Sequence, residues 1–253
     1  SQGAQVTYLD VDAEGFIDLN ELKNAITDKT FLVSVIHGNN EIGTINNIED
    51  IGNFCRVNKI LFHTDACQSF TKVPIDVKKV DVDLITINSH KIHGPKGVGA
   101  LYIREGIKIT PLLHGGGHEK NARSGTENIP GIVGFAKAVD ISNSKDVKKM
   151  EKLRDKLMLG LLKISGTKLN GSELKRLCNN VNISFEGIEG EALGAFLESE
   201  GIYVSTGSAC LSHSQQGSHV LKALGIPKSQ AESSIRFSLS KFTTEKEINF
   251  VIK

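Results

Sequence analysis

A lysine stands between an apolar run and a turn rich in glycine in the segment 89–99, which has the sequence SHKIHGPKGVG. Lys91 follows the run VDLITI (82–87), so its amine lies where a strand shields it from water and where it can form a Schiff base with a carbonyl compound. A surface turn has the same composition, because Gly, Pro and Lys are common in turns. The segment alone leaves both interpretations open.

A carboxylate follows the preceding strand-like run. Asp65 lies in FHTDACQS (62–69), 26 residues before Lys91, which is about one strand–helix–strand step. An aspartate at this place can hold the protonated nitrogen of a pyridine ring, or it can cap the helix that follows, as is common at such junctions. In either case we expect Asp65 and Lys91 at the ends of different strands on one edge of a sheet.

A third polar cluster follows another apolar run. Asn40 lies in HGNNEIG (37–43), directly after TFLVSVI (30–36). An asparagine at a strand end can donate a hydrogen bond from its amide to a phenolic oxygen. Turn chemistry built from Asn-Asn-Glu-x-Gly explains the same residues.

These clusters need a scaffold, and the first half of the chain alternates strand and helix patterns. Strands are predicted at 6–9, 30–36, 60–63, 82–87 and 98–103, and helices at 19–26, capped by Asp18, and at 45–58. The run 30–36 is apolar throughout, as expected for a strand buried on both faces. The alternation favours a parallel sheet with helices on its faces. Ligands bind at the carboxyl ends of such strands, so we expect the three clusters to form one site.

The composition changes after residue 131. The stretch 141–163 is rich in lysine and has apolar residues at helical spacing, which predicts a long amphipathic helix leading to a second domain. Strands are then predicted at 181–185, 202–204 and 235–239, and helices at 189–200, 218–224 and from 244 onward. We therefore expect an N-terminal domain over 1–140 and a smaller C-terminal α+β domain over 141–253.

Composition excludes several classes of protein. The chain has 253 residues with 30 Lys+Arg against 29 Asp+Glu, a balance that disfavours nucleic acid or an anionic membrane as the main partner. No apolar run reaches the ~18 residues of a membrane span, and no signal-peptide pattern opens the sequence. The four cysteines form no C-x-x-C pair, so a zinc ribbon is excluded and no metal site is predicted. We expect a reduced, cytoplasmic protein.

Six segments occur in the order that is typical of one enzyme family. They are NNEIG (39–43), HTDACQS (63–69), SHKIHGPKGVGALY (89–102), GGGHEKNARSGTEN (115–128), STGSAC (205–210) and SSIRFSLSKFTTEKEI (233–248). Together they resemble the cysteine desulfurases of aminotransferase class V that serve iron–sulfur cluster assembly and nitrogenase maturation. The resemblance implies an α/β fold of the pyridoxal phosphate (PLP) fold type I: a mostly parallel sheet with helices on both faces, plus a smaller α+β C-terminal domain.

The resemblance also implies roles for residues around the cofactor. Lys91 matches the lysine that carries PLP, and Asp65 matches the carboxylate that holds the pyridinium proton. The other matching positions are Gln68 and Asn40 at the phenolic oxygen, Asn88 and His90 on the phosphate side, and Thr126, which reaches the phosphate of the neighbouring subunit. The active unit is accordingly expected to be a homodimer.

For the substrate, the resemblance implies that Arg236, together with Asn40, binds L-cysteine. Arg236 matches the arginine of the substrate carboxylate, for which a planar guanidinium is well suited. Cys210 matches the nucleophile that takes the sulfur as a persulfide while L-cysteine becomes L-alanine, and a thiolate is needed for this. The sulfur is then passed to an acceptor protein such as an iron–sulfur scaffold. Cys55, Cys67 and Cys178 are expected to be packing residues.

Two departures from the family pattern lead to further expectations. Asn88 stands where a serine is common, so its contact with the phosphate is in question. The family's N-terminal portion, which supplies a phosphate-binding loop and a histidine that stacks on the ring, has no counterpart here. We expect the isolated chain to bind PLP weakly or not at all unless a complementary polypeptide or segment supplies that part. The alternatives are a related lyase acting on selenocysteine or cysteine sulfinate, and an incomplete subunit that binds a scaffold protein.

Overall fold

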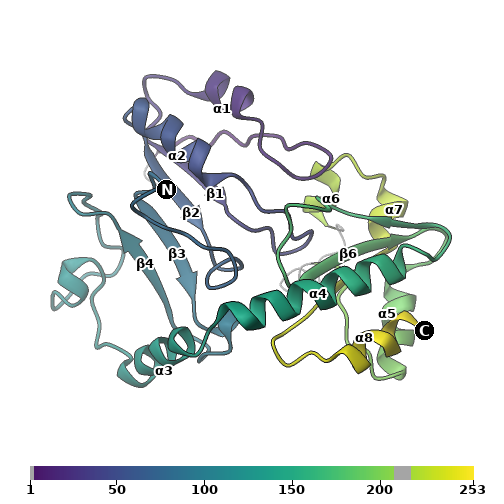
Figure 1. Ribbon diagram of the computed structural model, residues 1–253. Coiled ribbons are helices and arrows are strands. Elements are labelled where there is room, and N and C mark those ends of the chain that lie inside the picture. The colour runs from purple at the N-terminus through teal and green to yellow at the C-terminus, as the bar shows by residue number, and fades with distance from the viewer. Residues whose placement is uncertain (1–2, 208–217) are drawn as a thin grey trace. The chain divides into compact units, whose positions relative to one another are not determined.

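The computed structural model describes residues 3–207 and 218–253 (Figure 1). By packing, the chain divides into two compact units. The four-stranded unit comprises Phe31–Ile36 and Asn47–Asn143, and the three-stranded unit comprises Ser1–Thr30, His37–Asn46 and Ser144–Lys253. The expected domain ranges 1–140 and 141–253 stay a prediction, and the compact units divide the chain differently.

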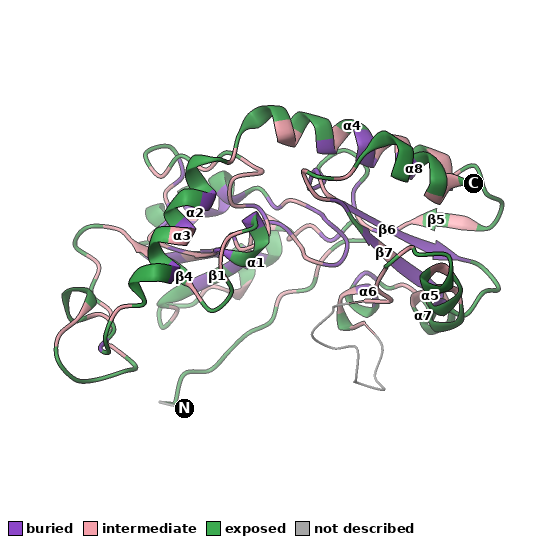
Figure 2. Cartoon of the chain, turned by 90° about the horizontal axis from the view of Figure 1, so that it is seen from below, coloured by how far each residue is buried: buried purple, intermediate pink, exposed green. Residues whose placement is uncertain are grey.

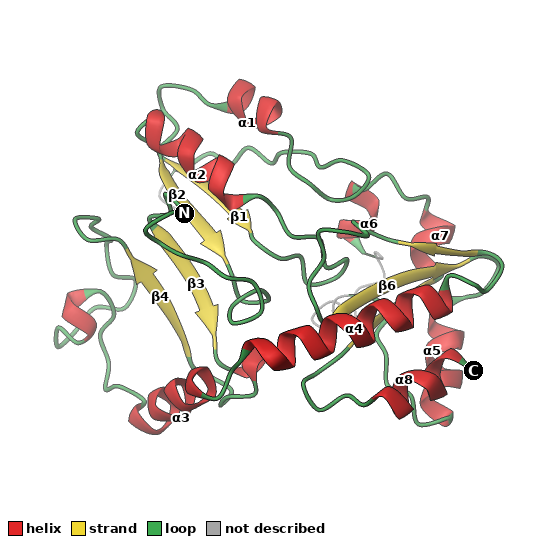
Figure 3. Ribbon diagram, in the orientation of Figure 1, coloured by secondary structure: helices red, strands yellow, loops and turns green. Residues whose placement is uncertain are grey.

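The four-stranded unit is built on a sheet with the order β1-β2-β3-β4 (Figure 3). Its strands are β1 (Leu32–Ile36), β2 (Leu61–Asp65), β3 (Leu84–Asn88) and β4 (Gly99–Ile103). β1, β2 and β3 are parallel, which confirms the mostly parallel sheet, whereas β4 is antiparallel to β3. The connection 89–98 between β3 and β4 is too short for the crossover of a dozen or more residues that a parallel pair needs.

Strand β1 was expected to be buried on both faces, and this expectation is wrong. Val33 and Val35 are buried, but Leu32 and Ser34 are exposed, so the strand alternates. The neighbouring strand β2 alternates in the same way, so one face of this sheet is buried more deeply than the other.

Four helical elements accompany this sheet. α2 (Ile48–Val57) begins at the cap Asn47 and buries Ile48, Ile51 and Cys55. α3 (Ile129–Asp140) begins at the cap Asn128, and the short 3-10 helix η2 (Glu119–Asn121) precedes it in the loop after β4. The 3-10 helix η1 (His90–Ile92) follows β3 and carries Lys91.

A small core fixes η1 against α3. Ile92, Phe135 and Ala138 are buried together, with Phe70, Ile87 and Val98 packed against them. The rings of Phe70 and Phe135 meet edge to face, with their centroids 6.2 Å apart. Because Ile92 is anchored here, the neighbouring Lys91 has a fixed main-chain position.

The three-stranded unit is antiparallel, in the order β5-β6-β7. Its strands are β5 (Thr167–Leu169), β6 (Asn180–Phe185) and β7 (Ser234–Ser238), and its helices are α1 (Leu19–Ala25), α4 (Ser144–Leu161), α5 (Gly190–Ser199), α6 (His219–Ala223), α7 (Lys228–Glu232) and α8 (Glu245–Ile252). Every residue of β6 is buried, so β6 forms the centre of this unit (Figure 2).

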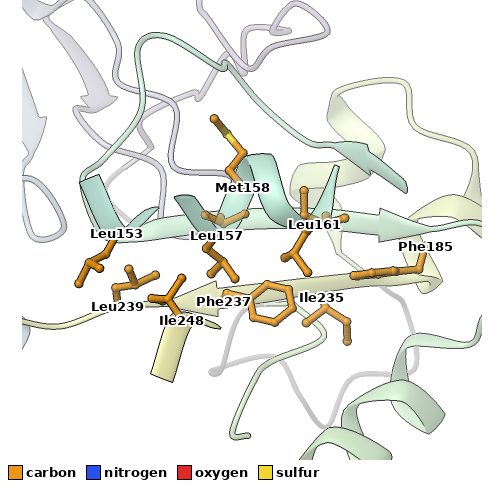
Figure 4. Packing of buried hydrophobic residues seen from close by; sticks show 11 residues of the cluster. Leu153, Leu157, Met158, Leu161, Phe185, Ile235, Phe237, Leu239 and Ile248 are labelled. Carbon is orange, nitrogen blue, oxygen red and sulfur yellow. The ribbon is translucent and has the colours of Figure 1, made fainter. Parts of the chain in front are cut away.

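The two faces of β6 differ in chemistry. Val181, Ile183 and Phe185 point to an apolar core that includes Leu157 of α4 and Ile248 of α8 (Figure 4). The alternate residues Asn180, Asn182 and Ser184 are also buried, on the opposite face. A strand that is apolar on one face and carries buried amides on the other must satisfy those amides by hydrogen bonds.

Several sequence predictions differ from the structure. The predicted strands at 6–9 and 202–204 are absent, although Ser205 forms an isolated bridge with Arg236. The long helix begins at Ser144, and α3 before it was not predicted. Helix α1 begins after Asp18 as expected, and its cap accepts from the N–H of Asn20. Within the described part of the chain, no helix is long and apolar enough to cross a membrane.

Candidate active site

The first predicted site residue, Asp65, ends β2 and lies opposite Thr86 of β3. Its Oδ1 accepts a hydrogen bond from the N–H of Cys67 at 2.8 Å, so the carboxylate shapes the turn that follows the strand. The N–H of Ala66 donates to the carbonyl of Thr86 at 2.9 Å, which connects this turn to the neighbouring strand. Residues 66–83 contain no helix, so the helix-capping role considered for Asp65 is not observed; its Oδ1 caps a turn instead.

Lys91 lies in η1, directly after β3, and it is exposed, so the shielding from water that was expected for its amine is not observed. The N–H of Lys91 donates to Oδ1 of Asn88 at 3.2 Å. The turn also favours a glycine at 94, because a Cβ there would collide with the Oγ of Ser89. Asn88, expected on the phosphate side, thus has an additional task here: its carbonyl oxygen holds the main chain of Lys91.

The thiol of Cys67 lies among these groups. Burial and a hydrogen bond with Asp65 raise the pKa of the Cys67 thiol to about 12, while a hydrogen bond with Asn88 and the charge of Lys91 act in the opposite direction. The thiol also lies 3.8 Å from the carbonyl oxygen of Thr86. Asp65, Asn88 and Lys91 lie at or directly after the ends of the adjacent parallel strands β2 and β3, which places them at one edge of the sheet.

The side chain of His63, two residues before Asp65, forms hydrogen bonds to both neighbouring strands of the same sheet. The Nδ1 of His63 lies 2.8 Å from the Oγ of Ser34, and its Nε2 lies 2.8 Å from the Oγ1 of Thr86. Burial lowers the pKa of His63, opposed by the charge of Asp65. The imidazole is neutral near pH 7 and joins β1, β2 and β3 side by side.

The remaining predicted cofactor residues of this unit are Gln68, His90 and Thr126. Gln68 is half-buried in the turn after Asp65, and its carbonyl accepts from the Nζ of Lys72 at 2.9 Å. His90 is exposed at the start of η1. Thr126 is exposed in the loop that leads to α3. Their predicted roles toward the cofactor stay predictions.

Asn40 and Arg236 come together in the three-stranded unit. Oδ1 of Asn39 accepts from the N–H groups of Glu41 and Ile42 at 2.8 and 3.0 Å, which forms the turn. Gly43 has a φ of 78°, which favours glycine. Turn chemistry is therefore observed, but the residue that performs it is Asn39. The carbonyl of Asn40 accepts from Nη1 of Arg236 at 3.0 Å.

Two buried amides of β6 hold this turn, and sequence reasoning missed both. Nδ2 of Asn180 donates to the carbonyl of Glu41 at 3.1 Å, and Nδ2 of Asn182 donates to the same oxygen at 3.1 Å. The carbonyl oxygen of each side-chain amide also has a donor, which fixes the orientation of the amide. Arg176 donates to Oδ1 of Asn180, and Asn170 donates to Oδ1 of Asn182. The only available signal was an Asn-x-Asn alternation in an otherwise apolar strand.

Glu41 is a buried carboxylate that was not predicted as a site residue. It is 1% exposed, and its Oε2 accepts from the Oγ of Ser218 at 2.6 Å. Ser218 also caps α6 by accepting from the N–H of Leu221 at 3.1 Å. Cys210, the predicted nucleophile, lies outside the described residues, so the structure gives no geometry for it.

The residues of the four-stranded unit fit PLP by their chemistry. The ends of β2 and β3 carry an amine that can react with an aldehyde, a carboxylate that can hold a protonated ring nitrogen, and an amide that can bond polar groups. A metal site has no such support: in residues 3–207 and 218–253, no group of three or more His, Cys, Asp or Glu side chains is placed to hold an ion.

Comparison with known proteins identifies the family. The family described as Aminotransferase class-V matches residues 1–251 of this chain. The chain belongs to the aminotransferase class-V family. The resemblance drawn from the six segments is thereby confirmed.

Two curated class-V relatives show the degree of similarity. The chain is 51% identical to a cysteine desulfurase IscS of Methanosarcina thermophila, over 100% of this chain and 63% of the relative. It is 49% identical to a cysteine desulfurase IscS of Clostridium botulinum, over 100% of this chain and 65% of the relative. The chain thus spans less than two thirds of the length of these relatives.

Solved structures agree with this assignment and confirm the α/β fold class. A NifS-like protein superposes with a TM-score of 0.89 at 41% identity, covering 99% of this chain and 67% of its own. A structure described as SspA in complex with cysteine superposes with a TM-score of 0.82 at 36% identity, covering 96% of this chain and 68% of its own.

Proposed function

We propose that this class-V chain carries out cysteine desulfuration with PLP as its cofactor. The observation that supports this most directly is the place of Asp65, Asn88 and Lys91 at the ends of the adjacent parallel strands β2 and β3, where the N–H of Lys91 donates to Asn88. The similarity to relatives named cysteine desulfurase, and to a structure described with bound cysteine, favours L-cysteine as the substrate.

The cofactor, when bound, supplies an aldehyde for an amine and a ring that accepts electrons. In this proposal Lys91 holds the aldehyde carbon and Asp65 holds the proton of the ring nitrogen. The remaining contacts are assigned to Gln68 and Asn40 at the phenolic oxygen, and to Asn88, His90 and, from a second subunit, Thr126 at the phosphate.

The residues of the chain then perform the reaction on the substrate. Arg236 binds the carboxylate of L-cysteine, and the amine of Lys91 moves a proton at the substrate Cα. The thiolate of Cys210 attacks the substrate sulfur, so an S–S bond forms as the substrate Cβ–S bond breaks. The net reaction converts L-cysteine and the Cys210 thiol into L-alanine and a Cys210 persulfide.

The protein partners follow from the product. A persulfide must be passed on, so we propose a sulfur-acceptor protein such as an iron–sulfur scaffold. The assignment of Thr126 to the phosphate of a neighbouring subunit requires a homodimer. Sedimentation of the protein with added PLP tests this assembly, and a monomer that is fully active contradicts it.

The test is production of alanine and sulfide from L-cysteine, with PLP in excess and dithiothreitol to release the sulfur. Lys91→Ala and Cys210→Ala should each abolish sulfide release. The matched controls are Lys96→Ala, an exposed lysine in the same turn, and Cys55→Ala in α2, which should keep activity. Release of sulfide by the Cys210→Ala variant would contradict the proposal.

The same variant separates the alternative activity. A lyase that acts on selenocysteine or cysteine sulfinate needs no protein thiol to attack the substrate. It should therefore form alanine from those substrates equally well after Cys210→Ala. Loss of L-cysteine activity together with retained activity on either of these substrates would favour the lyase.

A further inference from the structure

One ammonium group connects two segments of the proposed cofactor site. The Nζ of Lys72 donates to the carbonyl of Gln68 at 2.9 Å and to the carbonyl of Lys91 at 3.3 Å. Gln68 follows β2 and Lys91 follows β3, so the side chain of Lys72 bridges the ends of two parallel strands. An ammonium has three donors on a compact charge, which suits it to bind carbonyl groups of two different segments.

The main chain before Lys72 folds back tightly. The N–H of Phe70 donates to the carbonyl of Ala66 at 2.8 Å, and the N–H of Lys72 donates to the carbonyl of Ser69 at 2.9 Å. These turns return the chain after β2 toward the strand end. Lys72 is four residues past Gln68 and yet reaches its carbonyl, as a helical turn allows.

Thr71 has an unusual main-chain conformation. Its φ is 63°, in the left-handed region, where a β-branched residue is strained. Such a conformation persists only where the surrounding contacts determine it, and it often occurs where function requires a particular geometry. The strained residue directly precedes Lys72, so the strain and the bridge occur at the same place in the chain.

The peptide groups on both sides of Lys91 are therefore held. Its N–H donates to Oδ1 of Asn88 at 3.2 Å, and its carbonyl accepts from the Nζ of Lys72 at 3.3 Å. The next residue, Ile92, is 5% exposed and packs in the core with Phe135. With three contacts on consecutive groups, the Cα of Lys91 has little freedom.

We propose that Lys72 is a positioning residue for Lys91 and Gln68. Its ammonium fixes the main chain of both residues, so that the amine of Lys91 and the side chain of Gln68 are presented to the cofactor from fixed points. This inference rests on the proposed function only for the role of Lys91, because the bridge itself is a property of the chain. Lys72 makes no contact with the reacting atoms in this proposal.

Three variants test the bridge by local hydrogen exchange. Lys72→Met removes the donors but keeps the length of the side chain, and Lys72→Arg keeps the donors. Lys79→Met is the matched control, because Lys79 is an exposed lysine of the same unit and its loss changes the net charge equally. In the full chain without cofactor, we expect faster exchange in the peptide that covers residues 88–94 for Lys72→Met alone, while the peptide that covers β6 is unchanged.

A second measurement reads the position of the Lys91 amine. The protein is incubated with excess PLP and reduced with borohydride, and the pyridoxyl group on Lys91 is quantified by peptide mass spectrometry. Lys72→Met should lower the initial rate of labelling at Lys91 about tenfold, because small displacements of a reacting group are costly. Lys72→Arg and Lys79→Met should label at the wild-type rate.

The outcomes distinguish this inference from the proposed function. Unchanged exchange over 88–94 and unchanged labelling in Lys72→Met would overturn the positioning role, as would an equal change in Lys79→Met. If the wild-type protein takes up no PLP at Lys91 but Lys72→Met still accelerates exchange over 88–94, the proposed function fails and the positioning of this segment stands.

Discussion

Arg236 donates a hydrogen bond from Nη1 to the main-chain carbonyl of Asn40 at 3.0 Å. The bond joins two of the residues assigned to the substrate, and both belong to the three-stranded unit. The bond uses the main-chain carbonyl of Asn40 and does not involve the side-chain amide of that residue. The geometry of substrate binding therefore depends on whatever fixes the turn that carries Asn40.

The first prediction concerns Asn182, which helps to fix that turn. Asn182→Ala removes the donor to the carbonyl of Glu41 and the acceptor of Asn170, and both partners are buried. We expect a loss of about 2–3 kcal/mol in the free energy of unfolding, because buried polar groups lose their partners. In the desulfurase assay, KM for L-cysteine should rise more than kcat falls, because Arg236 lies opposite Asn182 in β7. Urea unfolding and steady-state kinetics measure these effects.

Asn53→Ala is the control for this variant. Asn53 is exposed on α2, so its substitution should change stability by less than about 0.5 kcal/mol. If Asn182→Ala also lowered the free energy of unfolding by less than about 0.5 kcal/mol, the Asn182 amide would not hold the turn. A fall in kcat with unchanged KM would contradict its role in substrate binding.

The residues proposed to carry the chemistry could be named from the sequence, because an amine, a carboxylate or a thiol is visible in it. Lys91 and Asp65 both follow apolar runs, and the structure confirms those runs as the parallel strands β3 and β2. The residues that position them were not predictable in the same way. The bridge from Lys72 to the carbonyl of Lys91 depends on a side chain and a carbonyl that lie 19 residues apart.

The errors in the fold have equally specific causes. The sequence from 128 to 131 is typical of a loop because it contains Asn, Pro and Gly. In the structure Asn128 instead caps α3, and Pro130 lies in the first turn of that helix, where no intrahelical N–H is needed. The turn 37–46 follows β1, and yet it packs with the three-stranded unit, because its carbonyls bind Asn180, which lies about 140 residues further along the chain. No local pattern records such a partner.

The second prediction concerns thiol reactivity. Burial raises the pKa of Cys55 to about 11, and burial with the hydrogen bond to Asp65 raises that of Cys67 to about 12. Since the thiolate is the nucleophile, both residues should react slowly with iodoacetamide at pH 7.5. We expect Cys210 to be alkylated first, and Cys67 to be alkylated far more slowly although it is half-exposed. Peptide mass spectrometry over time gives the four rates.

The pH dependence of labelling provides the check. Raising the pH to 9 should accelerate labelling at Cys67 in proportion to hydroxide, because its thiolate remains a small fraction throughout this range. If Cys67 reacts at the rate of Cys210 at pH 7.5, the environment assigned to it by Asp65 is wrong.

The third prediction is a loss of stability in mild acid that is caused by His37. Burial lowers the pKa of His37 to about 4, and the side chain is 3% exposed. The unfolded chain therefore takes up a proton near pH 6.5, whereas the folded chain excludes it until about pH 4. Because the unfolded state binds more protons in this window, stability falls as the pH falls through it. Between pH 7 and pH 5 this amounts to about 2 kcal/mol.

The comparison is made with His37→Gln and with His219→Gln, whose histidine is exposed on α6. Urea unfolding at pH 7 and at pH 5 should show a smaller difference for His37→Gln than for the wild type. His219→Gln should show the wild-type difference. His63, whose pKa is also lowered by burial, contributes with the same sign and remains in both variants. An equal pH difference in the wild type and in His37→Gln would refute the assignment.

The fourth prediction separates the strain at Thr71 from the bridge made by Lys72. Thr71→Gly should raise the free energy of unfolding by about 0.5–1 kcal/mol. Glycine adopts the φ of 63° without a clash, and this gain exceeds the extra main-chain entropy that glycine loses on folding. Since the ammonium contacts belong to Lys72, exchange over 88–94 should stay at the wild-type rate. Thermal unfolding and hydrogen exchange measure the two effects. Faster exchange over 88–94 in a stabilised Thr71→Gly variant would mean that the stiffness of the threonine, rather than the ammonium alone, holds Lys91 in place.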